Sequence, residues 1–384
     1  MKGLVLKAEW QPREDYVLSD FERDTGKAVT GSAVWRHPKL AVEQVPVPQP
    51  APDQVLVRVK ACGVCGSDIH FYETDDQGYI LYPGLTKFPT ILGHEFSGVV
   101  EEVGSQVKGL QRGDLVTAEE MIWCGYCTPC RNGFPNHCAN LEEIGFTIPG
   151  AFAEFIAIGA KYCWKIDAIA QRLGDVDKTF EVGALTEPTC VTYNAMFARA
   201  GGFRPGAYVV IFGTGPLGLA AVGLARAAGA GKIIAFEVSP ERRELAVKLG
   251  ADHVIDPTQT APSQAVLELT QGEGADLFVE AAGAQQITVP AMEKCLAINA
   301  KIVLIGRAAQ RVPIYLESFQ VRRSQLYGSQ GHSGDANFPN VIRLVASGRL
   351  DLSPIITGRF SLDNVLTAIA ESPARRHGKI TVKP

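Results

Sequence analysis

The pattern of apolar and polar residues divides the chain into two halves. Before about residue 205, the apolar residues come in short runs. Residues 54–61 alternate apolar and polar positions, as a half-buried strand does, and residues 96–107 predict β-structure with turns at Gly98 and Gly104. The first half is therefore expected to be rich in short strands.

The second half follows a different pattern, in which short apolar runs alternate with helical segments. The runs lie at residues 208–212, 233–237, 253–256, 275–283, 301–306 and 324–329. This alternation predicts a doubly wound parallel sheet, and hence an α/β fold. Ser239 and Pro240 predict a helix start, because a capping hydroxyl is followed by proline at the first helical position. From about residue 336 the pattern is mixed, and this tail is expected to pack against the first half.

A glycine-rich motif follows the first strand of that sheet. In Gly213-x-Gly215-x-x-Gly218 the first glycine permits a tight turn, the second lets the backbone approach a pyrophosphate, and the third allows close helix–strand packing. Glu237 ends the next strand, where an acid binds the ribose hydroxyls of NAD and repels the extra phosphate of NADP. The predicted cofactor-binding residues are Gly213, Gly215, Pro216, Leu217, Gly218, Glu237 and Arg242.

Two alternatives to this NAD site stay open. Arg242 and Arg243 lie near Glu237 and could instead accommodate NADP. The motif could also be a glycine-rich structural turn beside a surface glutamate.

Four cysteines crowd into fifteen residues of the first half, CGYCTPCRNGFPNHC. Cys124, Cys127, Cys130 and Cys138 have the spacing C-x2-C-x2-C-x7-C, which can wrap one Zn²⁺ tetrahedrally. Because four thiolates leave no open position for substrate, this zinc should be structural. An iron–sulfur cluster is the alternative, although the spacing differs from ferredoxin runs. Four free cysteines are a third interpretation.

Length, net charge and composition make several classes of protein improbable. The 384 residues favour two domains. A formal net charge of −4 without a basic block argues against nucleic-acid binding. No stretch reaches the roughly 20 apolar residues of a membrane span, and the first residues lack the pattern of a signal peptide. We therefore expect a cytoplasmic protein, whose clustered thiols bind metal rather than form disulfides.

Two further segments, CGVCGSDIH (62–70) and GHE (93–95), supply Cys65 and His94 as candidates for a second, catalytic zinc with an open position. Residues 93–107, GHEFSGVVEEVGSQV, match the signature G-H-E-x-x-G-x-x-x-x-x-G-x-x-V. With CGxCGSDxH, the four-cysteine lobe and GxGxxG in the same order, the chain resembles the zinc-dependent medium-chain alcohol dehydrogenases over essentially its whole length. LTEPTCVTYNA (185–195) resembles the polyol, sorbitol dehydrogenase-like branch.

The resemblance implies roles for individual residues. Cys65 and His94 would be the first two ligands of the catalytic zinc, and Glu187 the third, with Cys190 or Glu95 as competing candidates. In this family the glutamate beside the ligand histidine can approach zinc when water exchanges. Asp68 would orient the ligand histidine, and Ser67 and His70 would relay the proton to solvent. Oxidation would proceed through a zinc alkoxide, with hydride transfer to NAD.

The resemblance also implies an architecture. A GroES-like β-barrel catalytic domain would span residues 1–190 and carry both zincs, with the structural lobe at 124–138. A Rossmann domain would span 191–337, and residues 338–384 would return to the catalytic domain. Relatives are dimers or tetramers, so a homo-oligomer is expected, a tetramer in preference to a dimer.

The substrate is suggested by segments that set this chain apart from short sorbitol dehydrogenases. They are an insertion at about residues 10–38, the loop 75–89, and GSQGHSG (328–334). These details resemble the bacterial branch that oxidises cyclic polyols of the inositol pathway, of scyllo-inosose type. Open-chain polyols and aminocyclitols are the alternatives.

Several polar residues could bind substrate hydroxyls. Gln330, His332 and Ser333 are candidates, with a flexible polar turn as the other interpretation. Glu119 and Glu120 are candidates too, with solvated surface as the alternative.

The sequence disfavours two functions of another class. A relative that has lost zinc and serves as a structural or NADPH-binding protein is disfavoured by retention of Cys65, His94, Glu187 and the lobe cysteines. A zinc-ribbon nucleic-acid module is disfavoured by the lack of basic surface.

Overall fold

The computed structural model describes residues 1–307 and 310–384, which form two compact units. The first unit comprises residues 1–187, 358–374 and 380–384, and the second comprises residues 188–357 and 375–379. The predicted domain limits, at 190/191 and 337/338, stay a prediction. Within the described residues, none of the helices is long and apolar enough to cross a membrane.

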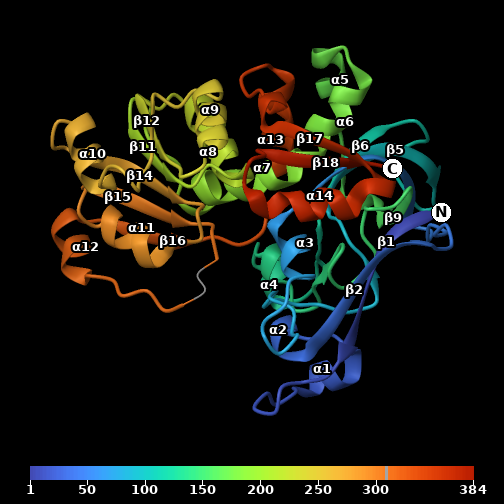
Figure 1. Cartoon of the computed structure of the whole chain (residues 1–384). Coiled ribbons are helices and arrows are strands. Elements are labelled where there is room, and N and C mark those ends of the chain that lie inside the picture. Colours follow the sequence, from blue (N-terminus) through green and yellow to red (C-terminus); the bar gives the residue numbers. More distant parts are fainter. Residues whose placement is uncertain (308–309) are drawn as a thin grey trace. The chain divides into compact units, whose positions relative to one another are not determined.

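The first unit is built from short strands (Figure 1). Its largest sheet has the order β10-β6-β5-β3-β18-β17, with β9 also paired to β3, and a second sheet has the order β2-β1-β4. The pair β7-β8 is separate. The strands are β1 (Lys2–Trp10), β2 (Trp35–Gln44), β3 (Gln54–Gly63), β4 (Thr90–Ile91), β5 (Glu95–Val103), β6 (Leu115–Ala118), β7 (Met121–Ile122), β8 (Glu142–Glu143), β9 (Phe155–Gly159), β10 (Cys163–Lys165), β17 (Ile356–Ser361) and β18 (Lys379–Lys383).

Short helices connect these strands. They are α1 (Asp20–Thr25), α2 (Gly31–Val34), α3 (Gly66–His70), α4 (Thr128–Arg131), α5 (Asp167–Leu173), α6 (Val176–Ala184) and α14 (Val365–Glu371), and α7 (Thr186–Tyr193) begins at the end of the unit. The two last strands come from the C-terminal part of the chain, and β18 pairs with β3 through Thr381 and Gly63. Residues 358–374 and 380–384 of the tail thus belong to the first unit, while residues 338–357 belong to the second.

The strand predicted at residues 54–61 is confirmed as β3, which lies at the centre of the large sheet. It pairs antiparallel with β5, and Gly63 lies opposite Glu95. The turn predicted at Gly98 is wrong, because Gly98 lies inside β5, where the register with β3 shifts. A Cβ at Gly98 would lie 2.2 Å from the Arg58 carbonyl oxygen, so glycine is needed there for close strand approach. At Gly104 the expected turn is present, since Val107 N–H donates to the Gly104 carbonyl.

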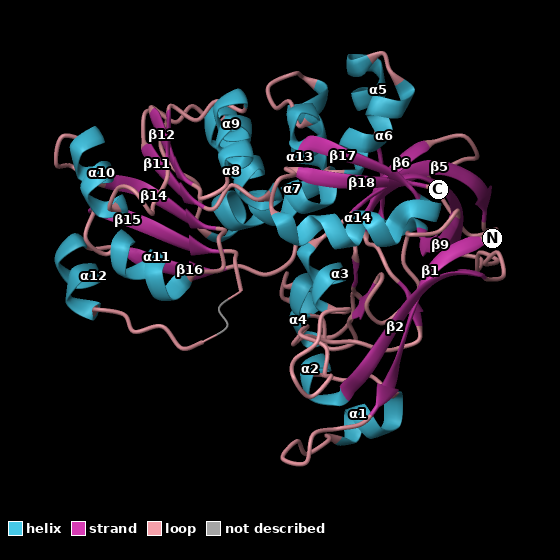
Figure 2. Ribbon diagram, in the orientation of Figure 1, coloured by secondary structure: helices cyan, strands magenta, loops and turns pink. Residues whose placement is uncertain are grey.

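The second unit contains one parallel sheet with the strand order β13-β12-β11-β14-β15-β16. Figure 2 shows helices on both sides of this sheet, with α8 and α9 on one side and α11 and α12 on the other. The six strands are β11 (Tyr208–Phe212), β12 (Lys232–Phe236), β13 (His253–Ile255), β14 (Ala275–Glu280), β15 (Leu296–Leu304) and β16 (Gln325–Gly328). All six predicted strands and the doubly wound arrangement are confirmed.

The helices of the second unit are α8 (Pro216–Ala227), α9 (Pro240–Lys248), α10 (Pro262–Leu269), α11 (Gln285–Met292), α12 (Leu316–Arg322) and α13 (Asn337–Ala346), and a π-helix follows α7 at Asn194–Arg199. The predicted start of α9 is confirmed, because the Ser239 hydroxyl accepts a hydrogen bond from Arg242 N–H and Pro240 occupies the first turn.

The insertion at residues 10–38 and the loop 75–89 hold each other in place. The Arg13 guanidinium lies 3.9 Å from the centre of the Tyr79 ring and pairs with the Asp75 carboxylate. Backbone bridges join Arg36 to Tyr79 and Ala28 to Thr86. Since Tyr79 is buried, these two segments form a single packed layer rather than two independent loops.

We expect Tyr79→Ala to lower the free energy of unfolding of the first unit by about 3 kcal/mol, because it leaves a cavity under Arg13. Urea denaturation followed by tryptophan fluorescence measures this unit alone, since the four tryptophans, at 10, 35, 123 and 164, all lie in it. Tyr72→Ala is the control, because Tyr72 is 50% exposed. Equal losses in the two variants would contradict this interlocking.

Candidate active site and metal centres

Cys65, His94 and Glu95 form a compact group in the first unit. Cys65 lies between β3 and α3, His94 immediately precedes β5, and Glu95 begins β5. One ligand atom of each lies within 4.8 Å of the other two. The pairing of Gly63 with Glu95 in the β3–β5 ladder brings these two sequence motifs together.

Gly63 makes room for the Glu95 carboxylate. A Cβ at residue 63 would lie 2.1 Å from Glu95 Oε2, a distance that no side chain could tolerate without displacing the carboxylate. This role of Gly63 is not evident from the sequence alone, although the glycine in CGVCG is a signal for it. Glycine at a strand position often marks close approach of another group.

Asp68 and Ser67 surround the same group. Asp68 Oδ2 accepts a hydrogen bond from Cys65 N–H at 2.9 Å, and Asp68 Oδ1 lies 3.8 Å from His94 Nδ1. The Ser67 Oγ atom is buried and makes no hydrogen bond to any of the residues described. A buried hydroxyl without such a bond fits a site that a bound molecule completes. His70 is more than half exposed, with Nδ1 3.4 Å from Glu73 Oε2.

Glu187 and Glu120 are two further buried acids near His94. Glu187 is buried near the start of α7, and one of its carboxylate oxygens lies within 4.8 Å of one from Glu120. Both carboxylates interact electrostatically with His94. Cys190, the competing candidate, is buried on the same helix as Glu187. In this geometry it is Glu95 that groups with Cys65 and His94.

Among the described residues, the buried acidic side chains of this site outnumber its one basic side chain, His94. Burial lowers the pKa of His94, but a hydrogen bond with the Cys65 thiol and the charges of Asp68 and Glu187 raise it well above its usual value. Burial raises the pKa of Glu120 to about 7, against the opposing effect of His94. The buried acids therefore favour a positive charge among them, and thiolate, imidazole and carboxylate are the donors that Zn²⁺ prefers.

Aromatic rings pack against this site and connect it to the insertion. The Phe146 ring centre lies 4.9 Å from that of His94, and Lys87 N–H in the loop 75–89 donates to the Phe146 carbonyl. Successive ring contacts run from His94 through Phe146, Phe71, Phe88 and Trp35 to Trp10. The insertion thus supports the position of His94 by packing. Phe146 was not identified from the sequence, since a single aromatic residue carries no local signal.

The four-cysteine lobe lies between β7 and β8. Its four sulfurs are reduced and lie within 4.8 Å of one another. Backbone N–H groups point at them: Cys124 N–H donates to Cys138 Sγ at 3.3 Å, and Asn140 N–H donates to the same sulfur at 3.3 Å. Such donors stabilise thiolates, so the arrangement fits one tetrahedral Zn²⁺.

Thiol acidity supports the same assignment. Burial raises the pKa of Cys124, yet hydrogen bonds from backbone N–H groups and the Asn140 amide bring it down to about 6. Burial, together with contacts with Cys127 and Cys138, raises the pKa of Cys130 to about 12. Because neighbouring thiolates repel one another, a cation is needed to hold all four in the charged form.

In the second unit, the three glycines of the nucleotide motif have separate physical roles. Gly213 has φ +82°, which favours glycine, and begins the turn after β11. A Cβ at Gly218 would lie 1.8 Å from the Gly213 carbonyl oxygen, so glycine is required for helix α8 to approach the turn. At Gly215 the nearest atom, from Arg242, would be 3.6 Å away, which leaves this backbone open to a ligand. Pro216 and Leu217 begin α8.

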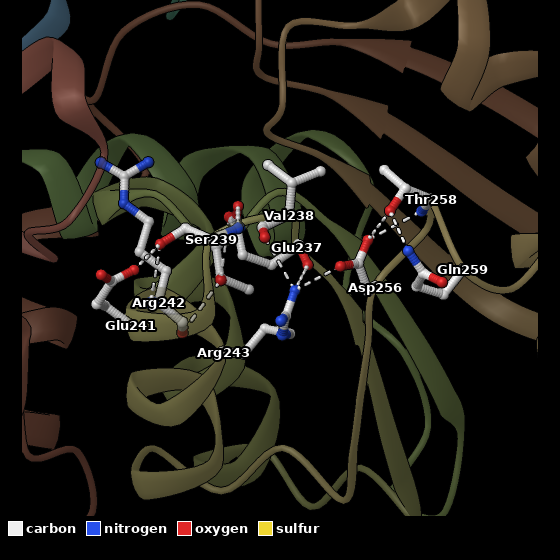
Figure 3. Close-up of polar contacts among 10 residues, drawn as sticks. Glu237, Val238, Ser239, Glu241, Arg242, Arg243, Asp256, Thr258 and Gln259 are labelled. Atoms are coloured by element: carbon white, nitrogen blue, oxygen red, sulfur yellow. Dashed lines mark hydrogen bonds and ion pairs between the residues drawn. The ribbon is translucent and has the colours of Figure 1, made fainter.

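Glu237 joins this loop to the end of β12. One carboxylate oxygen accepts from Thr214 N–H at 2.7 Å, and the other accepts from Ser239 N–H at 2.9 Å. Figure 3 shows Arg243 between Glu237 and Asp256, where its guanidinium donates to the Glu237 carbonyl and to the Asp256 carboxylate. Arg243 therefore has a structural role, and Arg242 is the arginine that lies beside Gly215.

The loop GSQGHSG is fixed by two asparagines. Asn194 Nδ2 donates to the carbonyls of Gln330 and Gly331, and Asn337 Nδ2 donates to the carbonyl of His332. His332 and Ser333 are buried, and Gln330 is exposed. The alternative of a flexible polar turn is therefore wrong for His332 and Ser333.

Glu119 and Glu120 are also buried, so the alternative of solvated surface is wrong for both. Glu119 carboxylate oxygens accept from the indole N–H groups of Trp123 and Trp164. Glu120 instead lies with Glu187 and His94.

Comparison with known proteins gives the family. Residues 51–168 match the model of the alcohol dehydrogenase GroES-like domain, and residues 216–347 match that of zinc-binding dehydrogenase. Scyllo-inosose 3-dehydrogenase of Thermotoga maritima is 48% identical over 376 residues, 95% of each chain. This chain belongs to the zinc-binding alcohol dehydrogenase family. The predicted fold class, a GroES-like barrel with a Rossmann sheet, is confirmed.

Other relatives show the breadth of this family. L-threonine 3-dehydrogenase of Pyrococcus horikoshii is 34% identical over 339 residues, 88% of this chain and 93% of that one. A solved alcohol dehydrogenase structure from Thermotoga maritima has a TM-score of 0.96 and 46% identity, with full coverage of both chains. A zinc-binding dehydrogenase of Sinorhizobium meliloti 1021 bound to NADP has a TM-score of 0.80 and 30% identity, covering 93% of this chain and 99% of that one.

For this dehydrogenase we expect Gly63→Ala to lose the zinc nearest Cys65 and to keep the lobe zinc, because the new methyl group displaces Glu95. Metal analysis of purified protein should fall from about two zincs per chain to about one. Gly66→Ala is the matched control, since nothing lies within 4 Å of a Cβ there. Full zinc content in Gly63→Ala would show that Glu95 is not needed to hold the metal.

Proposed function

We propose that this dehydrogenase oxidises a secondary alcohol of a cyclic polyol of scyllo-inosose type, using zinc and NAD. The observation that carries the proposal is the 48% identity, over 95% of both chains, to an enzyme named for scyllo-inosose. Open-chain polyols and aminocyclitols are kept as alternative substrates to be tested beside it.

Cys65 and His94 would hold the catalytic zinc, with Glu95 or Glu187 completing the set. The grouping of Cys65, His94 and Glu95, and the effect of Glu187 on the pKa of His94, support these assignments. When bound, zinc supplies a Lewis acid that makes an alcohol more acidic. Cys124, Cys127, Cys130 and Cys138 would hold a second, structural zinc, as their mutual distances support.

The remaining residues would move the alcohol proton to solvent and hold the His94 ring in its orientation. Ser67 would take the alcohol proton, because its Oγ is buried beside the ligand loop and makes no hydrogen bond to the described residues. His70, half exposed on the same short helix, would pass it to solvent. Asp68 would keep His94 in its orientation, as the 3.8 Å separation supports.

Cofactor choice would rest on Glu237. Gly213, Gly215, Pro216, Leu217 and Gly218 would bind the pyrophosphate at the start of α8, while Glu237 and Arg242 would contact the adenosine ribose. The buried Glu237 carboxylate, held between Thr214 and Ser239, supports NAD because it would repel a 2′-phosphate. The NADP-bound relative makes this preference the first point to measure.

Finer features of the proposal follow the family resemblance. We infer a cytoplasmic homo-oligomer, a tetramer in preference to a dimer. A catalytic domain at 1–190, a nucleotide domain at 191–337 and a returning segment at 338–384 complete the proposed organisation.

The test of this function is initial-rate NADH formation with a panel of alcohols. Scyllo-inosose, myo-inositol, sorbitol, xylitol, threonine and ethanol are each assayed with NAD⁺ and with NADP⁺. We expect the highest catalytic efficiency with scyllo-inosose and NAD⁺. Selective oxidation of sorbitol or threonine by zinc-loaded protein would reject the cyclic substrate and keep the zinc and dehydrogenase assignments.

Removing the charge of Glu237 should relax cofactor choice. We expect Glu237→Gln to raise the ratio of kcat/KM for NADP⁺ to that for NAD⁺ by about tenfold, because the repulsion of the 2′-phosphate is lost. Glu241→Gln is the control, since Glu241 is an exposed acid on the first turn of α9. If Glu241→Gln changed the ratio as much as Glu237→Gln, the preference for NAD⁺ would come from the overall negative electrostatic potential of this surface and not from Glu237 itself.

A further inference from the structure

Two adjacent glutamates, Glu119 and Glu120, have different neighbours. Both lie in the link between β6 and β7, and both are buried. Glu119 faces the aromatic side of this link, where its two carboxylate oxygens accept from the Trp164 and Trp123 indoles at 3.1 and 3.0 Å. Its backbone N–H donates to the Tyr162 carbonyl. Glu119 is therefore explained by packing and hydrogen bonding within the fold.

The Glu120 side chain has different neighbours. One of its carboxylate oxygens lies within 4.8 Å of a Glu187 oxygen, and its charge interacts with that of His94. Its backbone carbonyl accepts from Ile144 N–H, which fixes the link at this point. A buried acid is thus held beside the proposed ligands.

We propose that Glu120 binds a second hydroxyl of the polyol, next to the reacting one, and so selects polyhydroxylated rings over simple alcohols. This inference rests on the proposed function. Each hydroxyl of a polyol is a donor, and a carboxylate accepts such hydrogen bonds more strongly than a neutral group does. A site that presents a buried acceptor disfavours an alcohol without the matching hydroxyl, because the acceptor then loses its partner.

A role as metal ligand is the competing explanation for Glu120. Glu120 does not belong to the group of Cys65, His94 and Glu95, but it groups with Glu187, itself a candidate ligand, so the choice of substrates must separate the two roles. A ligand would matter equally for every substrate, since each would need the metal. A hydroxyl partner would matter only for substrates that carry the second hydroxyl.

The experiment compares three substrates that differ in hydroxyl number: cyclohexanol, trans-1,2-cyclohexanediol and scyllo-inosose. We measure kcat/KM with NAD⁺ for the wild type, Glu120→Gln and Glu120→Met, with zinc content determined for each. The glutamine variant keeps size and a weaker acceptor, and the methionine variant removes the acceptor. Glu119→Gln is the matched control, one residue away and also buried.

We expect Glu120→Gln to lose about 10-fold, and Glu120→Met about 100-fold, in kcat/KM for the diol and for scyllo-inosose. For cyclohexanol both variants should stay within about threefold of the wild type, with unchanged zinc content. Glu119→Gln should keep the wild-type ratio between the three substrates, even if it lowers stability.

Equal losses on all three substrates, or loss of zinc in the Glu120 variants, would overturn the inference and leave the proposed function standing. Failure of the zinc-loaded wild type to oxidise either polyhydroxylated ring would overturn the proposed function, and this inference with it. The two failures are therefore distinguishable in the same experiment.

Discussion

The constraint on which the first unit depends is negative charge buried around one imidazole. Asp68, Glu95, Glu120 and Glu187 are all less than 8% exposed, and Cys65 adds a thiol that hydrogen-bonds His94. Taking an unpaired ion out of water costs several kcal/mol, so a single histidine cannot balance this set. A divalent cation can, and its binding energy then contributes to folding. The four lobe cysteines pose the same problem with thiolates, which their N–H donors reduce and the proposed second cation would solve.

The rest of the first unit holds these buried side chains in position. The β3–β5 ladder sets Gly63 against Glu95, which leaves space for the carboxylate. Phe146 packs on His94, and a row of aromatic rings carries this packing out to Trp35 and the insertion. Rigid support of this kind matters because a ligand misplaced by even a fraction of an ångström weakens a metal site. The insertion thus supports the site through packing.

Much of this was predictable from sequence, because it depends on local patterns. The six parallel strands, the start of α9 and the cysteine grouping follow from periodicity, capping and spacing. The family resemblance already placed Glu95 near the Cys65 and His94 site. The packing of the Phe146 ring on His94 and the different neighbours of Glu119 and Glu120 were not predictable, since they depend on how distant segments pack together. Gly98 shows the same limit: a glycine that suggests a turn instead permits two strands to approach closely at an irregular register.

The most direct measurement is anomalous X-ray scattering from crystals, with data collected on both sides of the zinc absorption edge. The account predicts two anomalous peaks per chain, one among the lobe sulfurs and one touching Cys65 Sγ and a His94 ring nitrogen. A peak at the lobe alone, in protein purified without chelator, would contradict it. The buried acids around His94 would then be balanced by protons rather than by a metal, and the proposed chemistry would fail.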